Sequence, residues 1–214
     1  MRIFARVMLL SLLTVSVSGV AHADTVALSS FSGGSDATSG SDQLYGWVFT
    51  VNAPISVTSL GVYDYGGASG LTVSHQVGIY NETTQALIGS VTVPAGSGGT
   101  MIDGFEFASV TPFSLTQGDT YEIVMTMPQG NTDYQIIEVS SETTASQVTY
   151  DNSAFGAGSS LAFTSDNGAF APGIFGPDFT FASSAATPEP SSLVLLGSGI
   201  LSMAGFARRR FRTA

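Results

Sequence analysis

Apolar residues alternate with polar ones along short segments of this chain, and such segments recur every eight to twelve residues. Within residues 43–52, for example, Trp47, Phe49 and Val51 fall on one face of an extended strand. Period-two patterns at this spacing are typical of antiparallel sheets. Away from its two ends, the chain has no window longer than ten residues with a helical period. We therefore expect an all-β fold, an antiparallel β-sandwich for which a jelly roll is one candidate topology.

The same pattern predicts strands over residues 55–63, 74–81, 86–93, 104–110, 120–127 and 178–182. Two stretches rich in Gly, Ser or Pro, residues 32–42 and 166–177, break the alternation and are predicted to be loops. We place the folded domain at residues 24–182 and a flexible linker at residues 183–190.

The positive charges lie only at the two tips of the chain. They are Arg2, Arg6, Arg208, Arg209, Arg210 and Arg212. After Arg6 comes a short apolar stretch, and Ala21, His22 and Ala23 then give the small-x-small pattern that a signal peptidase cuts. Residues 1–23 are thus predicted to be a secretory signal, with Asp24 as the first residue of the mature chain; the alternative is a buried N-terminal helix.

The C-terminus has three parts. Pro188, Glu189 and Pro190 cannot continue a helix or a central strand, because the two prolines lack an N–H and have a fixed φ. Residues 191–207 are uncharged, and as a helix they would be roughly 25 Å long, close to the ~30 Å hydrocarbon core of a bilayer. We predict a transmembrane helix there, with residues 208–214 as a basic cytoplasmic tail.

This three-part end, Pro-Glu-Pro followed by an apolar span and then Arg208, Arg209 and Arg210, resembles the PEP-CTERM sorting signal of Gram-negative bacteria. The resemblance covers residues 187–214. It implies recognition by an exosortase, a membrane-embedded transpeptidase that would remove the helix after transient anchoring in the inner membrane. It further implies delivery to the cell surface or to an extracellular matrix rich in exopolysaccharide. The alternative is an ordinary C-terminal anchor that is never cut.

The composition between the two tips excludes several classes of function. Fifteen of the sixteen acidic residues lie within residues 24–187, where there is no Lys or Arg. Nucleic-acid binding is excluded because no cation is available to meet a phosphate. Acidic polysaccharides would be repelled unless a divalent cation bridged them. The chain has no cysteine, which removes thiol catalysis and disulfides.

Residues 44–123 also resemble domains of other bacterial surface proteins that carry sorting signals and have no assigned activity. The segments that carry this resemblance are GWVFTV, LGVYDYGGASGL, SHQVGIY and TPFSLTQGDTYEI. It implies a β-sandwich of adhesive or structural type and fixes no ligand.

Few residues point to catalysis. His75 is the only histidine after the signal, and alternation places it on one face with Val77 and Ile79. We expect it to be a packed, hydrogen-bonded core residue; a Ser-His-Asp triad stays open, although no spacing supports one. A pair of carboxylates could serve a glycosidase, but no motif selects a pair. Three strand glutamates are predicted to be solvated: Glu106, Glu122 and Glu138.

Acidic turn residues suggest calcium, which binds six to eight oxygen ligands. The candidate ligands are Asp36, Asp42 and Asp64, each near glycines, while Asp151 with Asn152 and Asp166 with Asn167 are weaker turn-type pairs. None of them matches the Asp-x-Asp-x-Asp-Gly loop. The alternative is that Asp, Asn and Gly are simply turn-forming residues.

Exposed aromatic rings could stack on sugars. Tyr63 and Tyr65 border a glycine-rich turn and are the predicted ligand-binding residues, whereas Trp47 shares its face with Phe49 and is predicted to be in the core. Together these features predict a non-enzymatic cell-surface or matrix protein associated with exopolysaccharide, processed by signal peptidase and exosortase. Other matrix glycans or surface proteins are expected as partners. A carbohydrate-binding module is the second hypothesis and a secreted hydrolase the third.

Overall fold

The computed structural model describes residues 24–65, 69–164, 166–168 and 173–183. These residues form antiparallel strands joined by turns and contain no α-helix. The strands are β1 (Thr25–Val26), β2 (Leu28–Ala37), β3 (Gln43–Val51), β4 (Ile55–Tyr63), β5 (His75–Asn81), β6 (Leu87–Val93), β7 (Thr100–Ile102), β8 (Phe105–Leu115), β9 (Thr120–Met127), β10 (Gln135–Thr144), β11 (Val148–Ala157), β12 (Asp166–Asn167), β13 (Ile174–Phe175) and β14 (Pro177–Ser183). The predicted all-β, antiparallel class is confirmed.

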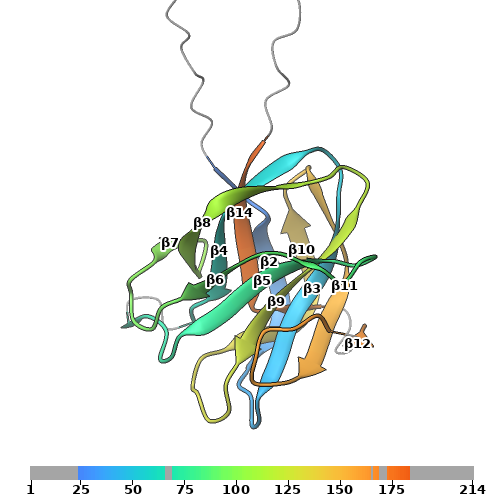
Figure 1. Ribbon diagram of the computed structural model, residues 1–214. Helices are drawn as coiled ribbons and strands as arrows, with labels where there is room; N and C mark the ends of the chain where they lie inside the picture. The colour runs from blue at the N-terminus through green and yellow to red at the C-terminus, as the bar shows by residue number, and fades with distance from the viewer. Residues whose placement is uncertain (1–23, 66–68, 165, 169–172, 184–214) are drawn as a thin grey trace, which may run out of the picture.

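The strands form three sheets. The first has the order β1-β14-β4-β8-β7, the second β12-β11-β3-β9-β5-β6 and the third, smaller sheet β13-β10-β2. In Figure 1 strands β5 and β6 of the six-stranded sheet cross in front of β14, so the two large sheets form two layers. A jelly-roll topology stays a prediction.

Aromatic side chains fill the space between the two large sheets. Trp47 on β3 stacks on Phe179 of β14 with ring centroids 6.0 Å apart, and Phe49 lies 4.9 Å from the same ring. All three are fully buried. The indole N–H of Trp47 donates to the carbonyl of Pro177 at 2.8 Å, so this buried donor is satisfied. The predicted core position of Trp47 is confirmed, and face-to-face packing through these rings makes the fold a sandwich.

The third sheet packs against the five-stranded sheet through Phe31 of β2. Its ring lies 5.7 Å from Tyr63 and 6.4 Å from Phe105, both edge-on. Beneath β2, Asp178 is fully buried and accepts hydrogen bonds from the backbone N–H groups of Leu28 at 3.1 Å and of Phe179 at 2.7 Å. Burial raises the pKa of Asp178 well above its usual value, so this carboxyl is held in its neutral form.

The predicted loop over residues 32–42 is wrong in its first half. β2 continues through Ala37 and pairs with β10, with Ser35 opposite Ile137 and Asp36 opposite Ile136. Most of its side chains are exposed, so the strand lacks the apolar alternation by which the other strands were predicted. Backbone pairing with β10 holds this polar strand in place. Within the predicted loop over residues 166–177, the short β13 is buried and pairs with β10.

The two ends of the described chain lie side by side. β1 pairs with β14, with Thr25 opposite Phe181, and the two strands meet at the upper end of the molecule in Figure 1. The predicted signal peptide and C-terminal helix lie outside the described residues. Within the described ranges, no helix has the length and apolar character needed to cross a membrane.

Candidate functional site

A cavity of about 130 Å³ lies between the end of β4 and the segment that leads into β10. Residues 63–65, 69–72 and 132–134 line it, and we call it the tyrosine pocket. Its position follows from the register of β14 on β4. Ser183 is opposite Ile55 and Pro177 is opposite Val62, so β4 reaches the pocket at the end far from Ser183. Tyr63 at the pocket is eight residues from Ile55, so at about 3.3 Å per residue the pocket lies roughly 26 Å from the end where the chain leaves the domain.

Three tyrosines give the pocket its aromatic surface. The ring of Tyr65 is 60% exposed and lies 5.0 Å from the ring of Tyr134. Tyr63 is half-buried and held edge-on by Phe105 at 5.5 Å. The structure therefore brings together Tyr63 and Tyr65, the two predicted ligand-binding residues. Tyr134 was missed because it lies about seventy residues further along the chain, and nothing in the sequence brings it to the turn that follows Tyr65.

The loop that forms one wall is fixed by close backbone contact. Gly70 has a φ of +71°, and a Cβ added there would lie 2.2 Å from the carbonyl carbon of Gly96. Next to it, Leu71 and Gly96 form an isolated antiparallel bridge. Only glycine fits this position, both for its positive φ and for the lack of space. The wall is thus built by packing rather than left open to rearrangement.

Asp133 forms the floor of the pocket. Its carboxylate accepts hydrogen bonds from the N–H of Thr72 at 2.7 Å, the N–H of Val73 at 3.1 Å and Nε2 of His75 at 2.9 Å. Burial alone would raise the pKa of Asp133, but the bonds from His75, Thr72 and Val73 outweigh it and lower that pKa. A carboxylate so fully occupied is a structural brace that ties the wall at residues 72–73 to β5.

His75 is fully buried, and both of its ring nitrogens are used. Nδ1 lies 2.7 Å from the carbonyl oxygen of Thr126, and Nε2 faces Asp133. The expectation of a packed, hydrogen-bonded histidine is confirmed. No serine hydroxyl shares these contacts in the part of the chain that the structure describes, so this pair does not form a Ser-His-Asp triad.

Negative charge converges on Tyr63. Burial raises the pKa of its hydroxyl, and the charges of Asp36, Tyr65 and Asp64 raise it further. Asp64 itself is only 6% exposed. Two of the three predicted calcium ligands, Asp36 and Asp64, therefore act on the same tyrosine. Asp42 does not act on Tyr63. It accepts a hydrogen bond from the N–H of Gln129 at 2.7 Å.

No group of three or more His, Asp or Glu side chains that could hold a metal ion occurs among the described residues. The calcium prediction stays a prediction. If calcium binds the folded chain only, millimolar calcium will raise the melting temperature above its value in EDTA. Calorimetry in the two buffers measures this difference, and equal melting temperatures would contradict calcium binding.

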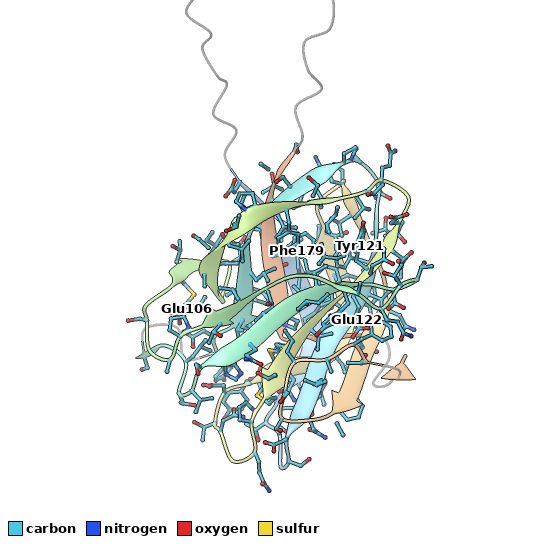
Figure 2. The ribbon with its side chains drawn as sticks, in the orientation of Figure 1. Glu106, Tyr121, Glu122 and Phe179 are labelled. Atoms are coloured by element: carbon cyan, nitrogen blue, oxygen red, sulfur yellow. The ribbon has the colours of Figure 1, made fainter. Side chains whose placement is uncertain are left out.

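Two of the three glutamates predicted to be solvated are buried: Glu106 is 1% exposed and Glu122 0%. The N–H of Gly99 donates to Oε1 of Glu106 at 2.6 Å, and the N–H of Thr164 donates to Oε1 of Glu122 at 3.1 Å. The alternation of β8 and β9 identifies their polar faces but not the loops that cover them. Figure 2 shows the two glutamates well apart on separate strands. The exposure predicted for Glu138 is confirmed.

The segment that covers Glu122 is apolar. Leu161 and Phe163 pack on the outer face of the six-stranded sheet against Leu44, Tyr80 and Val124. A wider hollow of about 450 Å³ lies beside Leu161 on that face, and none of the residues that line it is ionisable. The tyrosine pocket is therefore the better candidate for a site that selects ligands by charge.

Comparison with known protein families gives a match at the C-terminus. Residues 186–210 match the PEP-CTERM protein-sorting motif. A search of curated proteins finds no match to the chain. The match confirms the predicted signal, so the chain is an exosortase substrate that is exported and sorted to the cell surface.

Burial raises the pKa of Glu122 from 4.5 to about 7; the hydrogen bonds from Thr164 oppose the shift and the charge of Glu82 adds to it. Because the folded form binds the proton more tightly, the stabilisation is full below pH 4.5 and is lost as pH rises through 7. We expect Glu122→Gln to abolish this loss, which amounts to about 3 kcal/mol. Urea unfolding from pH 4 to pH 8 measures it.

The exposed Glu138→Gln is the matched control and should keep the pH dependence of the unmodified chain. The raised pKa of Asp178 also makes the free energy of unfolding fall as pH rises, and it does so in every variant. The difference in pH dependence between the variants therefore isolates Glu122. If Glu122→Gln left the pH dependence of the free energy of unfolding unchanged, the raised pKa of Glu122 would be contradicted.

Proposed function

We propose that this chain is a non-enzymatic component of the cell surface or extracellular matrix that associates with exopolysaccharide. The observation that carries the proposal is that the chain ends and the tyrosine pocket lie at opposite ends of the domain. Its two ends leave side by side through β1 and β14, and the tyrosine pocket lies at the opposite end of β4. A domain held at one end on a surface would present that pocket outward.

The surface chemistry supports a matrix role. With no Lys or Arg within residues 24–187, the domain has no basic side chain with which to bind other acidic proteins or phosphates, and its polar side chains are mainly hydroxyls, amides and carboxylates. Such groups exchange hydrogen bonds with hydrated glycans. During processing, signal peptidase and the exosortase act on the two ends, and residues 191–207 span the inner membrane transiently.

The test is the fate of the termini in the native producer. We expect mass spectrometry to find a mature chain that begins at Asp24 and lacks residues 191–214, recovered from the matrix fraction. Replacement of Arg208, Arg209 and Arg210 by serine should leave the uncut chain in the inner membrane, because the signal then lacks its cytoplasmic cations. Tyr65→Ala, a change far from both ends, should be processed normally. A mature chain found only in the periplasm would contradict the matrix role.

A carbohydrate-binding module is the second candidate, favoured by the exposed ring of Tyr65 beside Tyr134. On a glycan array we expect a discrete hit that weakens about tenfold or more in Tyr65→Ala, because a stacking face is lost. Leu87→Ala, a change at an exposed apolar side chain of the six-stranded sheet, should bind as the unmodified chain does. Equal binding by Tyr65→Ala would exclude the module. A secreted hydrolase is not proposed, because Glu106 and Glu122 lie under separate segments and both ring nitrogens of His75 are occupied.

A further inference from the structure

We propose that the tyrosine pocket binds a protonated amino group, presented by an amino sugar of the matrix polysaccharide. The inference rests on the proposed glycan association and names the chemical class of the ligand at that site. It follows from the lining of the pocket, from the charge of the domain and from the number of protein oxygen atoms that calcium or a neutral sugar would need.

The lining combines aromatic faces with two carboxylates, and that of Asp133 already accepts hydrogen bonds from Thr72, Val73 and His75. Tyr65 and Tyr134 lie 5.0 Å apart at the mouth, with their rings inclined at 49°, and Tyr63 is held beside them. Tilted aromatic rings around a small cavity are the arrangement that attracts ammonium groups, through the negative faces of the rings. Asp64 adds a carboxylate in the same lining. The volume of about 130 Å³ suits a headgroup rather than a length of polymer.

The charge of the domain favours a cation. No Lys or Arg occurs between residues 7 and 207, and His75 is committed to Asp133. An anionic sugar would find no positive charge in the pocket lining and would meet Asp64 and Asp133 instead. Burial is the main cause of the raised pKa of Tyr63, and the nearby charges of Asp36, Tyr65 and Asp64 raise it further. The remaining acidic residues extend the same field over the surface and would steer a cation toward it.

Calcium and a neutral sugar fit less well. Calcium requires six to eight oxygens, and the described residues hold no cluster of three acidic side chains. A neutral sugar would need carboxylate oxygens free to accept its hydroxyls, but Asp133 already accepts three hydrogen bonds. An ammonium group is attracted by the charges of Asp64 and Asp133 and by the negative faces of the aromatic rings, and this attraction requires no carboxylate oxygen without a hydrogen-bond partner. It is therefore the occupant that fits this lining best.

The experiment compares two probes that differ only at nitrogen: a glucosamine tetrasaccharide with free amines, and its fully N-acetylated form. Calorimetry is performed on the processed protein recovered from its producer. We expect the free amine to bind at least about tenfold more tightly than the acetylated form, and its affinity to fall with added salt. Asp64→Asn should remove about tenfold of the preference for the amine. Tyr65→Ala should weaken binding of the amine without loss of folding, because that ring is 60% exposed.

The matched control is Glu142→Gln, which changes the net charge by the same amount at an exposed position of β10. It lies eight residues from Tyr134, roughly 26 Å along the strand. Equal loss in Glu142→Gln and Asp64→Asn would show a general charge effect and overturn the site. If both probes bound with equal affinity and Tyr65→Ala weakened both, the pocket would bind glycans, but the preference for an amino group would be overturned. Binding of neither probe would also overturn the inference, whereas the matrix role stands or falls by the recovery of the mature chain.

Discussion

The constraint on which this structure depends is the absence of any lysine or arginine between residues 7 and 207. The buried carboxyl groups have no arginine or lysine partner, and backbone N–H groups supply most of the hydrogen bonds that they accept. Asp178 accepts from Leu28 and Phe179, Glu106 from Gly99, and Glu122 from Thr164. Asp133 adds His75 to two backbone donors. Backbone donors fix position but bring no net charge, so burial raises the pKa of Asp178 and Glu122.

These carboxylates also connect parts of the fold that the sheets leave separate. Asp178 holds the start of β2 onto β14, and Asp133 holds residues 72–73 against the segment before β10. Glu122 binds the covering segment at Thr164 to β9. With no cysteine in the chain, the apolar core around Trp47 and Phe179 joins the sheets, and these hydrogen bonds hold connecting segments onto them. One such brace, Asp133, lines the tyrosine pocket.

Alternation predicted the strands that bury one apolar face. It placed Trp47 and His75 inside, and it identified Tyr63 and Tyr65 at the edge of a turn that proved to line a cavity. It failed where a side chain's surroundings come from distant segments. The burial of Glu106 and Glu122 depends on covering loops, and β2 is held by pairing with β10 rather than by its own apolar pattern. Tyr134 joins the pocket only through the fold, so no local signal could have revealed it.

The same lack of cations links export to recognition. A chain without basic residues in its body offers nothing to compete with the arginines at its tips for the cytoplasmic side of the membrane. Once outside, that composition gives the domain a field of one sign, which repels anions and attracts cations. Because β1 and β14 leave together at one end, attachment of either terminus would orient the domain in the same way. The pocket at the far end of β4 would then face away from the cell wherever the sorting signal is cut.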